Sequence, residues 1–163
     1  MELRDLYNKK RELTGLTVKK GDPIPRGYYY VTVVIFIQND KDKFLIQKRS
    51  IDKGGDWANT GGHPKTGESS LEGIVTEVKE ELGININPNK LTLFKTIKTE
   101  DDFIDLYYLK ANINLDNLVL QEEEVQDVTW FSIDEINSLI EQGQFHRNHD
   151  LMYYECLKYL KLK

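Results

Sequence analysis

Three glutamates near the middle of the chain, Glu77, Glu80 and Glu81, are spaced so that their side chains would meet on a helix. Residues three and four positions apart lie on one face of a helix. Like charges this close repel, at a cost of about 0.2–0.5 kcal/mol per pair even on an exposed helix. A divalent cation reverses the sign of that interaction, and Mg²⁺ prefers carboxylate oxygens as ligands. The spacing therefore indicates a metal site.

The segment around these glutamates has the pattern of one amphipathic helix. Apolar residues recur at steps of three and four: Leu71, Ile74, Val75, Val78 and Leu82. Ser69 and Glu72 have the spacing of a capping box, and Gly83 is a natural left-handed stop. Gly73 lies inside the helix, where glycine costs about 1 kcal/mol relative to alanine. We expect another backbone or a ligand to approach there, with a tolerated glycine as the alternative.

The segment 61–84 resembles the signature of the Nudix hydrolases, G-x5-E-x7-R-E-U-x-E-E-x-G-U, where U is a bulky aliphatic residue. The matching positions are Gly62, Glu68, Glu77, Val78, Glu80, Glu81, Gly83 and Ile84. The arginine of the signature is replaced by Thr76. A pattern with this many fixed spacings is specific, unlike a lone glycine motif.

The resemblance implies a loop-helix-loop that holds one or more divalent cations, Mg²⁺ or Mn²⁺. Its implied metal ligands are the side chains of Glu77, Glu80 and Glu81 and the backbone carbonyl of Gly61. Glu68 would brace the loop and the signature arginine. Because Thr76 cannot form that ion pair, we expect a less fixed orientation of Glu68 and Glu77.

Three residues are assigned to substrate binding: Arg49, His63 and Glu68. Arg49 ends a predicted strand beside the loop of the signature, where it would contact a substrate phosphate, although a solvated strand end explains it equally. His63 follows Gly62 directly, and ordinary polar surface is the alternative for a loop histidine. Two later histidines, His146 and His149, are interpreted as solvated or capping residues.

An acidic run, Glu122 to Glu124, precedes a predicted strand that contains Trp130 and Phe131. It resembles the distal acidic loop of the family, which implies a further metal ligand or the general base. We assign Glu77, Glu80 and Glu124 to catalysis, and the base stays open between Glu77 and the acidic run. A charged surface loop is the alternative for each of its three glutamates.

Composition and length set further bounds. A chain of 163 residues predicts one domain, 1–163, with a real core. The net charge of −5 argues against binding a nucleic-acid polymer through a basic face. The chain has neither an apolar run near 18 residues nor a secretion signal, so no membrane association is expected. A single cysteine, Cys156, suits the cytoplasm and is expected to pack in the core. A homodimer is left open.

The remaining segments predict an α/β sandwich of the Nudix type, with a mixed, largely antiparallel sheet between helices. Residues 1–27 form an arm with two short strands. Predicted core strands cover 28–37, 44–49, 57–60, 91–98, 103–109 and 125–131, the first two paired as a hairpin. Ser132 caps a helix from Ile133, and a last helix spans 148–162 with Leu151, Tyr154, Leu157 and Leu160 on its apolar face.

The predicted activity is metal-dependent hydrolysis of a diphosphate bond in a nucleoside diphosphate linked to another moiety, a small-molecule substrate. A weak arm motif is similar to that of isopentenyl diphosphate isomerases, which is the first alternative. The Cys-Gly-His-Pro run of those enzymes reads Gly61-Gly62-His63-Pro64 here, and Tyr28 to Tyr30 stand where their metal-binding histidines are expected. A non-catalytic nucleotide-binding domain is the second alternative, motivated by Thr76.

Overall fold

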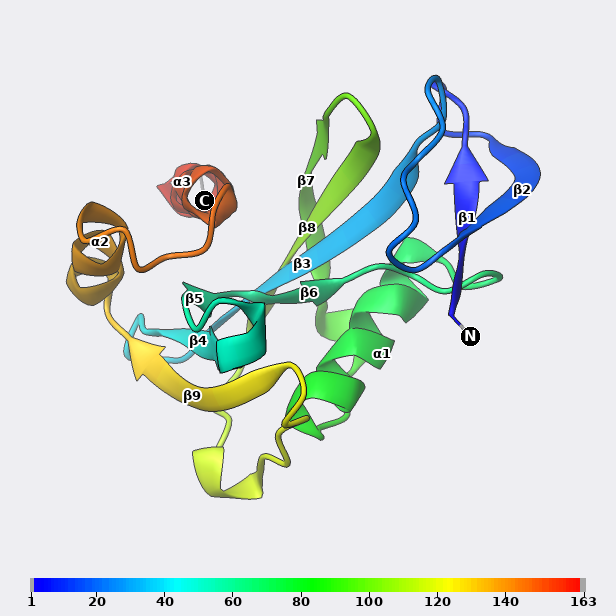
Figure 1. Cartoon of the computed structure of the whole chain (residues 1–163). Coiled ribbons are helices and arrows are strands. Elements are labelled where there is room, and N and C mark those ends of the chain that lie inside the picture. Colours follow the sequence, from blue (N-terminus) through cyan, green and yellow to red (C-terminus); the bar gives the residue numbers. More distant parts are fainter. Residues whose placement is uncertain (1, 162–163) are drawn as a thin grey trace.

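The computed structural model describes residues 2–161 (Figure 1). Its strands are β1 (Leu3–Tyr7), β2 (Leu13–Lys19), β3 (Tyr30–Gln38), β4 (Phe44–Arg49), β5 (Trp57–Ala58), β6 (Thr60–Gly62), β7 (Thr92–Lys98), β8 (Asp102–Lys110) and β9 (Val125–Phe131). The α-helices are α1 (Ser70–Leu82), α2 (Ile133–Glu141) and α3 (His149–Lys161). None of the helices in these residues is long and apolar enough to cross a membrane.

The central sheet is mixed and largely antiparallel, as predicted. Its strands follow the order β5-β4-β3-β8-β7, with β6 also paired to β3 and β9 to β4. Only β3 and β8 run parallel, in register from Tyr30↔Asp102 to Gln38↔Lys110. The expected hairpin of β3 and β4 is wrong in extent, because these strands pair only at Gln38↔Phe44. Beyond that point β6 takes the place beside β3, and β9 lies beside β4.

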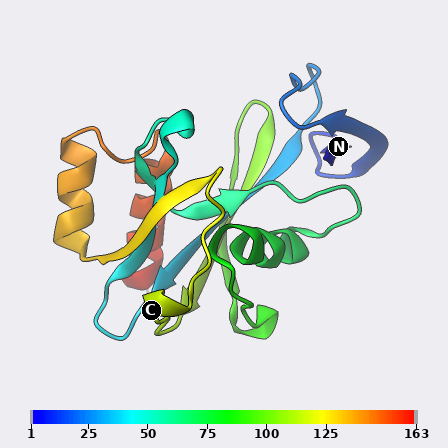
Figure 2. The same cartoon turned by 60° about the horizontal axis from the view of Figure 1, so that its bottom comes forward.

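The two faces of the sheet carry separate layers of helices. Because side chains alternate along a strand, Val33 and Ile35 of β3 pack on the side of α1, whereas Val34 and Phe36 face α2 and α3. Figures 1 and 2 show α1 on one side of the sheet and the other two helices opposite. β3 is therefore buried on both faces, which explains its uninterrupted apolar sequence.

Helix α1 has the predicted ends. Ser69 accepts the Glu72 N–H, Glu72 accepts the Ser69 N–H, and Gly83 closes the helix in the left-handed conformation. Gly73 is required by a close approach, since a Cβ there would lie 2.6 Å from Cγ of Pro64 in the preceding loop. This contact seats the loop of the Nudix signature directly on the helix.

The apolar face predicted for α3 is right in its second half, where Leu157 and Leu160 are partly buried against the core, and wrong in its first half. Leu151 and Tyr154 are exposed, whereas Met152, Tyr153 and Cys156 are buried against the sheet. The sequence of α3 is only weakly amphipathic. The contacts with the sheet therefore determine which of its side chains are buried. Cys156 packs in the core as expected, and burial raises the pKa of its thiol to about 12.

Candidate active site

Helix α1 places Glu77 and Glu81 in the interior, against the short strand β6. Both side chains are buried, with residue exposures of 9% and 7%. A Cβ on Gly62 would lie only 2.3 Å from Cδ of Glu77, so only glycine allows the carboxylate to sit this close to the backbone. A Cβ on Gly61 would lie 2.5 Å from the carbonyl oxygen of Val33. The two glycines thus bring a bare strand backbone up to the carboxylates.

The buried carboxylates are electrostatically unfavourable on their own. Burial raises the pKa of Glu77; the hydrogen bond that it shares with Glu81 lowers this pKa, and nearby Glu80 raises it. Burial and Glu77 raise the pKa of Glu81 well above its ordinary value. Nε2 of Gln47 donates to Glu81 Oε1 at 2.7 Å, and Thr60 fixes Gln47 by donating to its Oε1 at 2.6 Å. The pair therefore needs either a proton or a cation, and Gln47 keeps Glu81 in place to receive it.

The third glutamate of the helix points elsewhere. Glu80 is 38% exposed and lies 2.6 Å from Nζ of Lys65 in the loop. Within residues 2–161, no three acidic, histidine or cysteine side chains are already gathered closely enough to hold a metal ion. Glu80 is thus engaged by Lys65 and is not gathered with Glu77 and Glu81.

The donor set nevertheless fits a divalent cation. Glu77 and Glu81 offer hard carboxylate oxygens, which Mg²⁺ and Mn²⁺ prefer. The backbone beside them is bare because Gly61 and Gly62 have no side chains, and both glycines line the cavity described below. The raised pKa values show that positive charge is what this place lacks.

Glu68 braces the loop of the Nudix signature. Within residues 2–161, it is not one of the residues that line the cavity described below. Its Oε1 accepts the Lys65 N–H at 2.7 Å, and its Oε2 accepts the Thr76 hydroxyl at 2.7 Å. Thr76 thus supplies a hydrogen bond in place of the ion pair that the signature arginine would form. The orientation of Glu68 is fixed by two bonds despite the substitution, and its predicted substrate contact stays a prediction.

A cavity of about 420 Å³ opens over β6 and the carboxylates. Its charged and imidazole-bearing lining residues are Glu2, Arg4, Lys20, Arg49, Lys53, His63, Glu77, Glu80, Glu81, Glu124, His146 and His149. Of the acidic run 122–124, only Glu124 is among the lining residues, and it lies 3.6 Å from Nζ of Lys53. Arg49 lines the cavity too, held by Asp56 at 2.9 Å.

His63 lies at the other end of the cavity. Its Nδ1 is 3.2 Å from the carbonyl oxygen of Val31, and its ring lies 4.7 Å from that of Tyr30. Burial, with Arg4 and Lys20 nearby, lowers the pKa of His63 to about 4. The ring is therefore neutral at physiological pH and can offer a hydrogen bond without a charge.

Sequence reasoning missed several polar residues of the cavity, among them Asn59, and the cavity position of two histidines. His146 and His149 are not the solvated residues that we expected, because residues 144–146 bond to Trp57 and carry both rings to the cavity. His149 Nδ1 accepts the Asn59 N–H at 3.2 Å, and burial lowers the pKa of this histidine to about 3. Asn59 is 2% exposed, and neither polar atom of its side chain has a partner within residues 2–161. These contacts join segments about ninety positions apart, which no local pattern reveals.

Comparison with known proteins assigns the family. Residues 28–153 match the model of the NUDIX domain. An uncharacterized Nudix hydrolase of Listeria monocytogenes, lmo0368, is 35% identical over 150 residues, which are 89% of this chain and 88% of that protein. The chain therefore belongs to the Nudix hydrolase family and is an enzyme of the pyrophosphohydrolase class.

Two further similarities bear on the fold and on the isomerase alternative. The crystal structure of DR0079 from Deinococcus radiodurans superposes with a TM-score of 0.73 at 21% identity, over 88% of this chain and 91% of that one. This likeness supports the α/β fold. An isopentenyl-diphosphate Delta-isomerase of Escherichia coli is 29% identical over 101 residues, only 56% of each chain. The isomerases are therefore distant, partial relatives.

Proposed function

We propose that the enzyme hydrolyses a diphosphate bond in a nucleoside diphosphate linked to another moiety, with Mg²⁺ or Mn²⁺ as cofactor. The observation that carries this proposal is the pair of buried carboxylates, Glu77 and Glu81, beside the glycine backbone of a charged cavity. Hydrolysis forms a bond from a water oxygen to phosphorus and releases the bridging oxygen with the other phosphate. Such a reaction needs a charge-neutralised diphosphate and an oriented water.

The metal would be held by Glu77, Glu80, Glu81 and the carbonyl of Gly61. When bound, it would neutralise phosphate charge and lower the pKa of a bound water. Gln47 and Thr60 keep Glu81 oriented for this purpose. The hydrogen bond from the Thr76 hydroxyl to Glu68 joins the loop to helix α1.

Glu124 is our choice for the residue that takes the proton from the attacking water, with Glu77 as the alternative. It lines the cavity from the residue just before β9, and its side chain is 31% exposed. Nζ of Lys53 lies 3.6 Å from this carboxylate. We assign Arg49, which also lines the cavity, to contact with a phosphate of the substrate.

The nucleoside part of the proposal is supported by Asn59, His146 and His149, three polar residues that line the cavity. The side chain of Asn59 has a free donor and a free acceptor in the interior, and an edge of a nucleobase offers the matching pair. A buried polar group without a partner costs free energy, so a bound base would stabilise it. His146 and His149 border the same region of the cavity.

The isomerase alternative lacks its key residue here. Gly61 stands where those enzymes have a cysteine, and Cys156 is fully buried in the helix layer on the opposite face of the sheet from α1. The second alternative rested on Thr76, which keeps a bond to Glu68 in the structure. Neither alternative is favoured by a residue of the cavity.

A substrate panel tests the proposed function. Nucleoside di- and triphosphates, sugar nucleotides, dinucleoside polyphosphates and coenzyme A are incubated with the protein and Mg²⁺ or Mn²⁺, and the products are separated. We expect turnover of at least one diphosphate diester that disappears in EDTA. Glu81→Gln should abolish most of it, whereas Glu141→Gln, an exposed glutamate of α2, should not. No metal-dependent product from any compound, or a Glu81→Gln variant at the parent rate, would overturn the proposal.

A further inference from the structure

The N-terminal hairpin, β1 and β2, is built into the wall of the active site. Its two strands form a separate sheet, joined to the core where Tyr7 exchanges backbone hydrogen bonds with Tyr29 at 2.7 and 2.8 Å. β1 also bonds to the loop of the Nudix signature: Thr66 N–H donates to the Leu3 carbonyl at 2.9 Å, and Gly67 N–H to Asp5 Oδ2 at 3.0 Å. The hairpin and the loop therefore hold one another in place.

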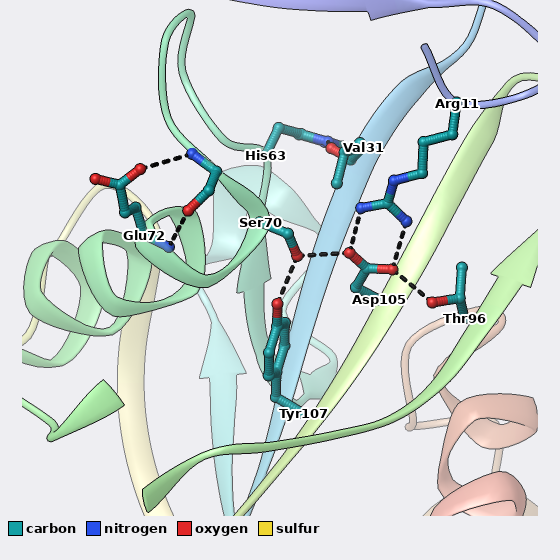
Figure 3. A network of polar contacts seen from close by, with 9 residues as sticks. Arg11, Val31, His63, Ser70, Glu72, Thr96, Asp105 and Tyr107 are labelled. Carbon is teal, nitrogen blue, oxygen red and sulfur yellow. Dashed lines mark hydrogen bonds and ion pairs between the residues drawn. The ribbon is translucent and has the colours of Figure 1, made fainter. Parts of the chain in front are cut away.

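A buried ion pair anchors the turn of the hairpin. Arg11 forms a bidentate pair with Asp105 of β8, at 2.8 and 2.5 Å, and Asp105 is completely buried (Figure 3). Ser70, the first residue of α1, and Thr96 of β7 donate to the same carboxylate at 2.5 and 2.8 Å. Asp105 thus faces neither the cavity nor solvent. A hairpin tied to α1 and to the sheet has a fixed position over the cavity.

This hairpin brings two cations to the cavity, Arg4 and Lys20. Nε of Arg4 is buried and has no hydrogen-bond partner within residues 2–161, and the nearest carboxylate, Glu2, is 3.8 Å away. The guanidinium lies 5.9 Å from the ring centre of Tyr30. Glu2 lines the cavity beside these cations, and the buried carboxylate of Asp102 accepts the hydroxyl of Thr32, another lining residue, at 2.7 Å.

These cations are separate from those that serve the proposed reaction centre. They surround His63, beside the start of β3, where Thr32 Oγ1 lies 3.4 Å from His63 Nδ1. Lys65 is the cation that acts on Glu77, and Arg49 and Lys53 lie beside Asp56 and Glu124. The cavity thus combines the carboxylates of α1 with positive groups from the hairpin and from residues 49–53.

We infer that Arg4 and Lys20 form a subsite for a phosphate group that the substrate carries on a moiety beyond the hydrolysed diphosphate. An arginine fork and a lysine are the residues that bind a phosphate dianion best, and the side chains of Arg4 and Lys20 both line the cavity. This inference rests on the proposed function and narrows its substrate class to diphosphate diesters with an additional phosphomonoester.

Matched pairs of substrates test the subsite. Coenzyme A and its dephospho form, and NADPH and NADH, each differ by one phosphomonoester at a distance from the diphosphate. With Mg²⁺, we expect kcat/KM to be at least about tenfold higher for the phosphorylated member of an accepted pair. Arg4→Gln and Lys20→Gln should each remove most of this preference through KM, with the unphosphorylated member unchanged. Arg4→Lys, which keeps the charge, should retain part of it.

Lys19→Gln is the matched control, because Lys19 lies on the same hairpin, is exposed and is not among the lining residues described. The same pairs are also titrated calorimetrically into protein kept in EDTA, which reports binding without turnover. A binding preference with no turnover would overturn the proposed function and leave the subsite standing. Equal treatment of both members by the parent protein in both assays, or an equal loss for both members in the Arg4 and Lys20 variants, would overturn the subsite.

Discussion

Two buried acidic sites lie at the two ends of helix α1, and they differ in one respect. At the N-terminal end, Asp105 is satisfied by Arg11, Ser70 and Thr96. Toward the other end, Glu77 and Glu81 are buried next to each other, with Gln47 as a neutral donor. Burial alone would raise the pKa of Asp105, but its three donors hold it below the ordinary value of 3.8, whereas the pKa values of both glutamates are raised.

This difference in partners distinguishes Asp105, which we interpret as structural, from Glu77 and Glu81, which we propose to be functional. The cation of the Asp105 site belongs to the chain, so this site contributes to stability in the absence of any ligand. Glu77 and Glu81 have no ion-pair partner within residues 2–161, so their burial costs stability, and under the proposed function a bound metal would supply the positive charge. A buried charge without a partner is unfavourable, which makes such a place a candidate site on physical grounds.

The largest expected effect is on activity at the glutamate site. Changing Glu81 to Gln should lower metal-dependent turnover by more than about 100-fold, because even outer-shell partners of a metal cost 10–100-fold when removed. The same change should leave the melting temperature in EDTA unchanged or raised, since it removes one of two neighbouring buried acids. Turnover and thermal unfolding measured on one preparation check both. A clear drop in melting temperature would show that the pair is structural.

The opposite result is expected at Asp105. Asp105→Asn should lower the free energy of unfolding by about 2–4 kcal/mol, because it leaves Arg11 without its counter-charge in a largely buried place. Urea unfolding measures this loss. If the cost were below about 1 kcal/mol, the anchor of the hairpin would lie in other contacts, such as the Tyr7–Tyr29 bonds.

The pH dependence distinguishes the parent protein from the Asp105→Asn variant. The folded pKa of Asp105 is lowered, so its contribution to stability is fully present above the ordinary value of 3.8 and is lost as the pH falls through the folded pKa. The difference in unfolding free energy between the two proteins should therefore be constant from pH 5 upward and shrink at lower pH. A difference that stayed constant down to pH 2 would contradict the ionised state assigned to Asp105.

A smaller effect is expected where Thr76 replaces the signature arginine. Thr76→Val removes the hydroxyl that bonds Glu68 and should cost about 1 kcal/mol of unfolding free energy. We expect a modest fall in turnover with it, since the loop loses one of the two bonds to Glu68. Thr76→Ser, which keeps the hydroxyl, is the control and should retain the parent stability.

The smallest effect concerns the competition for Glu80. Lys65→Gln removes the cation that lies 2.6 Å from Glu80, so a metal no longer has to displace it. Exposed ion pairs contribute about 0.2–1 kcal/mol, which corresponds to an increase of up to about fivefold in metal affinity. Calorimetric titration with Mn²⁺ measures it. Weaker metal binding in this variant would show that Lys65 supports the site.

Much of the fold could be predicted because its signals are local. The caps of α1, the left-handed Gly83 and the apolar run of β3 each depend on residues within a few positions of one another. The glutamates of α1 were found in the same way, from steps of three and four. By contrast, the limited pairing of β3 with β4 and the buried face of α3 depend on which other strands compete for the same neighbours.

The sequence by itself determined the family, the helix that carries the three glutamates and the glycines beside them, because a fixed local geometry demands fixed spacings. Only the tertiary structure decided which charges meet. It paired Arg11 with Asp105, turned Glu80 toward Lys65, and brought Arg4, Asn59 and His149 to one cavity. These contacts join residues distant in the chain, and their pairing follows from strand order and loop paths, which leave no period in the sequence.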